Sequence, residues 1–251
     1  MPQIYGKTAR AQPTKSADAV QLQPRLTAYG DLVTVPIGIG VNSIADEGSY
    51  FNATNATIGT GIIHALTTSW SGTAALFCLR NTDAEGAKRI NLDYIRLVTG
   101  ATAISMTAAT SIEFAITIDN TNRYSSGGTS ITPVNANMDS SSATIAALNF
   151  GAVVLSAASG SVRTTTRGAL PRRAAPAMVT GDQFMFDFGG SAPPAVDTIG
   201  AAAPATAAAS FYIPSGPVII GGGDSLNFHL WYPSGATTAP TFEFEIGWWE
   251  R

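Results

Sequence analysis

The chain has few of the residues that build cross-linked or reactive sites. Its 251 residues include one cysteine, two histidines and only 12% charged side chains. Because Cys78 has no partner for an internal disulfide, the fold must be stabilised by packing, sheet pairing or association. No apolar run approaches the roughly 20 residues of a membrane-spanning helix, so we expect no membrane partner.

Motifs for catalysis, metal binding and cofactor binding are also missing. The sequence has no G-x-S-x-G nucleophile motif and no H-x-H, H-E-x-x-H or C-x-x-C spacing. His229 lies on the more polar face of an alternating segment, which indicates an exposed or interface residue. We therefore expect no enzyme, no metal and no cofactor, although distant residues could still assemble a Ser-His-Asp triad.

The first 30 residues differ from the rest in charge and periodicity. They contain four basic residues against the single acid Asp18, and neither a helical nor a strand period. We predict an extended arm over residues 1–30, with no apolar signal segment, and expect synthesis in a cytosol. Its candidate contact residues are Tyr5, Lys7, Arg10, Lys15 and Arg25. The net charge of −3 makes nucleic acid an unexpected partner.

Residues 31–251 have the pattern of one all-β domain. Short segments rich in Val, Ile, Thr and aromatic residues alternate with clusters of Gly, Pro, Asn and Ser. This pattern predicts an antiparallel, jelly-roll-like β-sandwich, with an immunoglobulin-like sandwich as the nearest alternative. The expected strands are 32–39, 61–66, 75–80, 90–98, 112–118, 145–155, 183–188, 210–213 with 218–220, 225–231 and 241–248.

Alternation is clearest in the last of these strands. Phe242, Phe244, Ile246 and Trp248 share one face, which predicts a strand at the centre of the core. In the segment from Ile90, the same pattern places Ile90, Leu92 and Tyr94 on one face, and Asn91 and Asp93 on the other.

The connections are predicted from turn residues. Residues 81–87 are typical of a hairpin loop, 221–224 of a tight turn and 233–240 of a loop between strands. Residues 189–210 form a low-complexity loop rich in Ala, Pro and Gly. The only weak helical pattern, over 142–148, fits a strand equally well.

Two further groups of residues are candidates for contact with a partner. Arg163, Arg167, Arg172 and Arg173 lie in eleven residues without an acid. This cluster suits ionic contact with an acidic neighbouring protein or with packaged nucleic acid, and a solvated loop equally well. Near the C-terminus, Trp249 is predicted to face outward beside Trp231 or Tyr232. Such an exposed aromatic patch is typical of subunit interfaces and glycan-binding surfaces.

Three stretches resemble structural proteins of tailed bacteriophages. They are residues 5–20, residues 122–139, and residues 226–233 with 242–251. The resemblance implies a virion component, most similar to a head decoration or cement protein on the capsid surface. Its expected partners are the major capsid protein and further copies of itself, as a homotrimer. No catalytic residue is implied.

Two other classes remain open at this stage. A receptor- or glycan-binding tail protein would also be rich in strands and aromatic residues. A single-jelly-roll shell protein is the other alternative, although an arm that touched a genome would be expected to carry far more than the +3 of residues 1–30.

Overall fold

The computed structural model describes residues 41–57, 59–65, 67–100, 112–170, 180–189, 210–233 and 240–251. The predicted arm and the expected strand 32–39 lie outside the described residues. The chain divides into two units, residues 1–39 and 40–251, and the fold below is that of the second. Its described part contains one helix, α1 (Val41–Asp46), and none that could cross a membrane.

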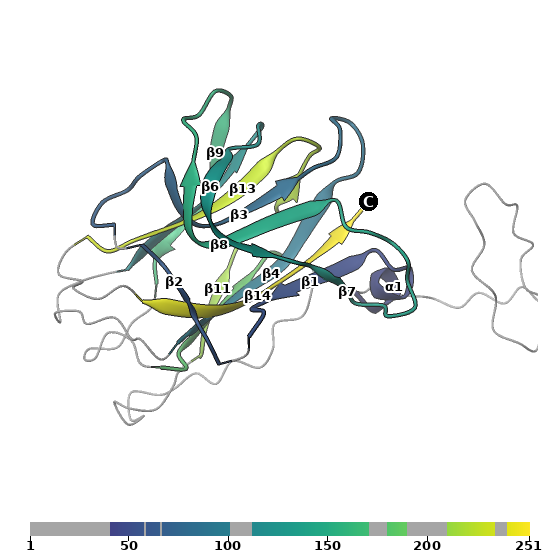
Figure 1. Cartoon of the computed structure of the whole chain (residues 1–251), viewed down its shortest axis with the longest axis horizontal. Helices are drawn as coiled ribbons and strands as arrows, with labels where there is room; N and C mark the ends of the chain where they lie inside the picture. The colour runs from purple at the N-terminus through teal and green to yellow at the C-terminus, as the bar shows by residue number, and fades with distance from the viewer. Residues whose placement is uncertain are drawn as a thin grey trace, which may run out of the picture. The chain divides into compact units, whose positions relative to one another are not determined.

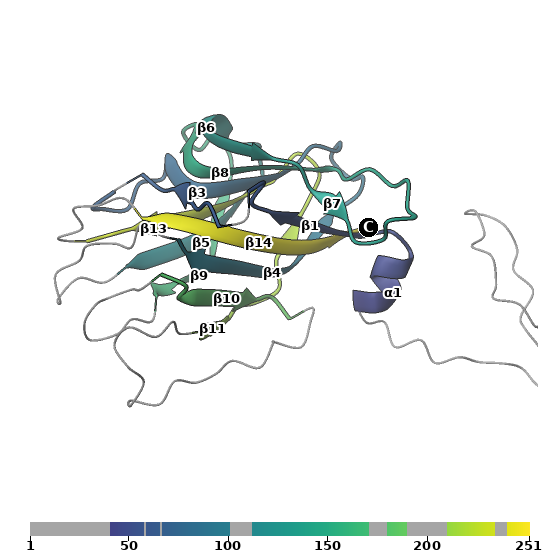
Figure 2. The ribbon, with the colours of Figure 1, turned by 60° about the horizontal axis from the view of Figure 1, so that its bottom comes forward.

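The described strands form two sheets (Figure 1), and all pairings except β10 with β11 are antiparallel. The larger sheet has the order β11-β10-β4-β14-β1-β7, with β12 beside β4 and β2 beside β14. Its strands are β1 (Tyr50–Thr54), β2 (Ile62–Ile63), β4 (Ile90–Thr99), β7 (Val134–Asn135), β10 (Gln183–Asp187), β11 (Ser210–Pro214), β12 (Ile219–Ile220) and β14 (Thr241–Glu250). Figure 2 shows β10 and β11 next to β4 at one side of this sheet.

The six-stranded sheet has the order β6-β8-β3-β13-β5-β9. Its strands are β3 (Ala74–Asn81), β5 (Glu113–Asp119), β6 (Tyr124–Ile131), β8 (Ala146–Leu155), β9 (Val162–Ala169) and β13 (Ser225–Trp231). Four consecutive strands of each sheet, β1-β14-β4-β10 and β3-β13-β5-β9, follow the strand order of a jelly roll. The predicted all-β, jelly-roll-like sandwich is therefore confirmed, with β6 and β8 as an addition beside β3.

The core lies between the two sheets and is rich in aromatic rings. Phe228 of β13 stacks on Phe77 and Phe114 within its own sheet and contacts Phe186 of the other sheet edge-to-face. Phe150 stacks on Phe244 across the sandwich with a centroid distance of 3.9 Å. Such pairs contribute beyond the area that they bury, so these rings join the two sheets.

The predicted alternation of the last strand is confirmed. Phe242, Phe244, Ile246 and Trp248 are all buried in the core, and β14 lies between β4 and β1 near the middle of its sheet. The expected side of Tyr94 is wrong, because the register of β4 against β14 shifts by one residue between Gly247 and Trp248. This β-bulge changes the face of the residues that follow Leu92.

One consequence of the bulge is that Asp93 is buried instead of exposed. Its side chain accepts a hydrogen bond from the Tyr50 hydroxyl at 2.6 Å. Burial and the neighbouring Asp93 carboxylate raise the pKa of Tyr50 far above its usual value, so this phenol stays a donor. The bulged residue is thereby held by a buried hydrogen bond.

Other differences from the sequence predictions concern strands and connections. The strands β1, β6, β7 and β9 were not predicted. β1 and β7 contain Asn and β6 contains Gly, which are depleted in strands, and β9 lacks an alternation of apolar and polar residues. The segment 81–87 is not a hairpin loop: it joins β3 to β4, which belong to different sheets. The turn at 221–224 is confirmed by the Asp224 N–H donating to the Gly221 carbonyl at 3.1 Å. The low-complexity segment lies largely outside the described residues.

We expect Phe228→Ala to lower the free energy of unfolding by about 3–5 kcal/mol, because it leaves a cavity between the sheets. Urea denaturation followed by circular dichroism measures the change. Val134→Ala is the control: Val134 is 59% exposed, so this variant should stay within about 0.5 kcal/mol of the unmodified protein. Equal loss in both variants would contradict the position of the core.

Candidate functional site

A pocket lies on the outer face of the six-stranded sheet, away from the core. Strand alternation sets this face: Leu226, Phe228 and Leu230 of β13 enter the core, so His229 and Trp231 point outward. The register places Ala115 of β5 beside His229, and Arg167 of β9 beside Ala115. Three neighbouring strands therefore bring their outward side chains together.

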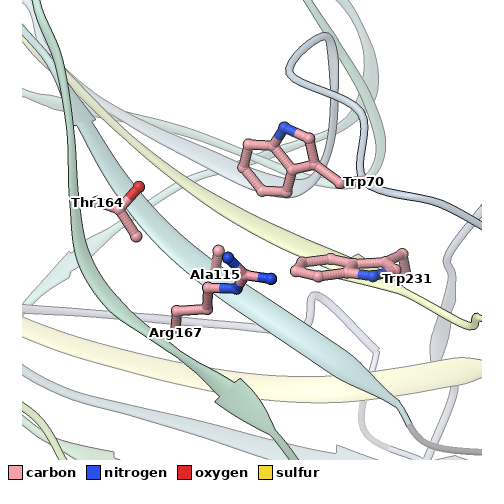
Figure 3. A pocket seen from close by; sticks show the side chains of 5 residues that line it. All are labelled: Trp70, Ala115, Thr164, Arg167 and Trp231. Atoms are coloured by element: carbon pink, nitrogen blue, oxygen red, sulfur yellow. The ribbon is translucent and has the colours of Figure 1, made fainter.

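The described residues that line the pocket are Trp70, Ala115, Thr164, Arg167 and Trp231, and its volume is about 360 Å³ (Figure 3). Trp70 comes from the segment between β2 and β3, and its side chain is 46% exposed. Figure 3 shows Trp70 and Trp231 on one side of the pocket and the Arg167 side chain reaching toward them. The site therefore combines an accessible indole with a guanidinium group.

Trp70 is held by two aromatic rings of β13. Its ring lies 4.4 Å from the His229 ring and 5.3 Å, edge-to-face, from the Trp231 ring. Trp231 is only 5% exposed and forms the base of this cluster of three aromatic rings. Since aromatic pairs at such distances stabilise each other, the exposed indole has a defined place.

His229 is a buried, neutral support and not the exposed residue that the sequence predicted. It is 2% exposed, and its Nδ1 lies 2.8 Å from the Ala74 carbonyl, which can only accept a hydrogen bond. The Nδ1 therefore carries the proton, and Nε2 accepts from the Thr117 hydroxyl at 3.1 Å. Burial lowers the pKa of His229 to about 4.

The second histidine is also buried and neutral. His64 is 2% exposed, and its Nδ1 lies 3.1 Å from the Tyr232 hydroxyl. Burial lowers the pKa of His64 to about 4. Both histidines are thus buried structural groups that stay neutral at neutral pH.

A buried arginine fixes the segment that carries Trp70. Arg123 lies between β5 and β6, and its guanidinium donates hydrogen bonds to the carbonyls of Gly72, at 2.5 Å, and Ser156, at 2.7 Å. It also forms an ion pair with Asp119 at 3.2 Å, and both side chains are at most 4% exposed. A buried ion pair needs such additional hydrogen bonds to offset its loss of hydration.

The other end of this network lies on β13. Asp119 accepts a hydrogen bond from the Asn227 side chain at 2.6 Å, so its carboxylate is bound from two sides. Thr73 adds a backbone bond to Leu155 at 2.8 Å. This network was not predicted from the sequence; the available signal was the pair Asp119 and Arg123 on either side of an Asn-Thr-Asn turn.

The arginine-rich segment is partly a strand. Residues 162–169 form β9, an edge strand in which Arg163 and Arg167 are exposed. Arg167 lines the pocket. Arg163 lies opposite Ile118 of β5, and a register shift in the pairing of β9 with β5 separates it from Arg167. Arg172 and Arg173 lie outside the described residues.

The predicted aromatic patch of Trp249 with Trp231 or Tyr232 is wrong. Trp231 belongs to the six-stranded sheet and Trp249 to the larger sheet, so they do not share a face. Tyr232 is fully buried, and Trp249 is partly buried beside Tyr50 and Asn91 in register. The exposed partner of Trp231 is Trp70, which the sequence analysis did not select because its surroundings have no periodicity.

The remaining predicted contact residues, Tyr5, Lys7, Arg10, Lys15 and Arg25, lie outside the described residues. In the described ranges, no three His, Cys, Asp or Glu side chains are placed to hold a metal ion together. Comparison of the chain with protein families, curated proteins and solved structures finds no match.

We expect stability to fall as the pH is lowered from 7 to 5. Both histidines have a pKa of about 4 when folded, below the ordinary 6.5, so the unfolded chain binds more protons in this range. Each histidine should therefore remove about 2 kcal/mol of unfolding free energy. Urea denaturation at several pH values measures the unfolding free energy. In His229→Gln this free energy should fall less steeply between pH 7 and pH 5 than in the unmodified protein, whatever the stability of the variant at pH 7. An unchanged slope would contradict the buried, neutral state of His229.

We expect Arg123→Met to cost about 3–5 kcal/mol of unfolding free energy, because it leaves the Asp119 carboxylate buried without its cation. The matched control is Arg96→Met, which removes the exposed ion pair with Glu245 and should cost about 0–1 kcal/mol. Thermal and urea denaturation compare the two variants. Similar small losses would show that the Arg123 network does not hold this face.

Proposed function

We propose that the chain is a non-enzymatic structural protein of a tailed-phage virion, which decorates and cements the capsid surface as a homotrimer. The proposal rests first on the resemblance of residues 5–20, 122–139 and the C-terminal segments to phage structural proteins. The jelly-roll sandwich supports it, because such folds serve as building blocks of viral particles. The partner is the major capsid protein.

The observation that carries the proposal in the folded domain is the character of β9. This edge strand is exposed over most of its length and presents Arg163 and Arg167. Charged side chains on an edge strand oppose pairing with a further strand, so β9 is suited to ionic contact through its side chains and not to strand addition. An acidic surface on a shell protein would complement it.

The other sheet edges are less suited to such contact. At β6, Gly127 and Gly128 have φ angles of 76° and 69°, and the register shifts twice against β8. At β7 the strand has only two residues, and β11 ends at Pro214, which lacks an N–H donor. Among the described edges, β9 therefore offers the longest charged surface.

Many equivalent sites on a shell would strengthen such binding. Each ionic contact in water contributes little, about 0–1 kcal/mol. A trimer that places three β9 strands and three predicted arms over the shell would gain affinity through effective concentration. The protein needs no reactive group for this role, only a rigid body and repeated contacts.

We expect the triple variant Arg163→Ala, Arg172→Ala and Arg173→Ala to attach more weakly to capsids that lack the protein. Attachment of the unmodified protein should weaken as salt is raised from 50 to 500 mM, because screening reduces ionic contact, and the triple variant should lose most of this dependence. Co-sedimentation with purified particles measures both.

The matched control is Arg89→Ala, which removes an exposed charge that is not on β9, in the loop between β3 and β4. Salt-independent attachment, or equal attachment of all variants, would contradict the role of the arginines. Assembly of the purified chain alone into closed shells would instead support the jelly-roll shell protein, and a dozen copies per virion would support a tail protein.

A further inference from the structure

We propose that the pocket between Trp70, Trp231 and Arg167 is a binding site for a carboxylate-bearing saccharide, of the sialic or uronic acid type. This goes beyond the proposed function, because it concerns a ligand of the free outer face and needs no shell protein. The proposal rests on the shape of the pocket, the fixed position of its indole and the charge of its wall.

Trp70 presents an accessible indole to the pocket. Trp70 is 46% exposed although its ring contacts both His229 and Trp231, so its other side stays open to the pocket. An indole combines a large apolar face with little conformational freedom, and it loses little entropy when a ligand binds. The C–H face of a pyranose ring is a flat apolar surface of matching size.

Buried hydrogen bonds hold the segment that carries Trp70 in place. Arg123 donates to the Gly72 carbonyl, and His229 donates to the Ala74 carbonyl, on the same segment as Trp70. At neutral pH the imidazole beneath Trp70 is uncharged, because burial lowers the pKa of His229 to about 4. A second layer of buried hydrogen bonds thus keeps the binding surface in place, as a preformed site requires.

Arg167 gives the wall of the pocket a positive charge. Among the described residues, no carboxylate forms an ion pair with Arg167, so its guanidinium is available in the pocket wall. A guanidinium binds a carboxylate in a bidentate manner, and the Thr164 hydroxyl beside it can donate to or accept from a sugar hydroxyl. The ligand must therefore carry both an apolar face and an anionic group.

These features favour a saccharide over two other ligands. A purely apolar peptide would bury Arg167 and Thr164 without partners, which costs free energy. A nucleic acid strand needs several basic side chains along its phosphates, whereas the described lining has one and the chain has a net charge of −3. The volume of about 360 Å³ is at the small end of ligand pockets and suits one sugar unit of a longer glycan.

The test is a titration of the full chain with 3′-sialyllactose and with digalacturonic acid, and with lactose as the neutral counterpart. Calorimetry gives the affinity, and the change in tryptophan fluorescence that is lost in Trp70→Ala reports the change at Trp70. We expect saturable binding of at least one acidic saccharide, about tenfold or more tighter than lactose and weaker at high salt.

Three variants separate the contributions. Trp70→Ala should weaken binding about tenfold or more, and Arg167→Ala should reduce the affinity for the acidic saccharide to that for lactose. Arg163→Ala is the matched control on the same strand and should bind like the unmodified protein. Circular dichroism and the melting temperature verify that all three variants fold.

No saturable binding of either acidic saccharide, or full binding by folded Trp70→Ala, would overturn the proposal. Binding of a mononucleotide or a peptide in place of the saccharides would also overturn it. The outcome is independent of the capsid experiment, because Arg163→Ala affects only particle attachment and Trp70→Ala only the saccharide.

Discussion

The buried ion pair of Arg123 and Asp119 is the interaction on which the outer face of the six-stranded sheet depends. Two charges at most 4% exposed lose their hydration, and they are tolerated only because every side of the pair is hydrogen-bonded. Arg123 binds the carbonyls of Gly72 and Ser156, and Asp119 binds Asn227. The pair thereby connects the segment that carries Trp70 to β13.

This buried network of Arg123, Asp119 and Asn227 makes the outer face of the six-stranded sheet different from its inner face. Its inner face packs phenylalanine rings against the larger sheet, while its outer face buries His229, Thr117 and Asn227 beneath loop segments. Apolar packing stabilises the sandwich but does not depend on the direction of individual contacts. Hydrogen bonds, by contrast, require particular partners in a particular geometry. The outer face is therefore where the structure defines a site, and the inner face is where it gains most of its stability.

The two proposals use different side chains of the edge strand β9. Arg163 and Arg167 lie on one edge strand, but a register shift in β9 separates them, so only Arg167 reaches the pocket. One strand can in this way serve ionic contact with a shell protein and recognition of a small anionic ligand. The exposed charges of this edge strand also oppose unwanted strand pairing.

The sequence by itself determined the all-β class, the position of most core strands and the burial of Phe242, Phe244, Ile246 and Trp248, because alternation over a strand is a local property. It also indicated Arg167 and Trp231 as contact residues, from charge and from residue type alone. It did not predict β9, whose sequence lacks an alternation of apolar and polar residues, or that segment 81–87 crosses between sheets.

Only the tertiary structure decided which side chains meet. The pocket joins residues that are up to 161 positions apart, from Trp70 to Trp231, and the bulge at Asp93 reverses the face that alternation assigns to Tyr94. Whether His229 is exposed depended on the Trp70 segment, held over it by Arg123. Local alternation predicts which face of a strand a residue lies on. Whether a distant segment covers that residue depends on long-range packing and on the pairing of buried charges.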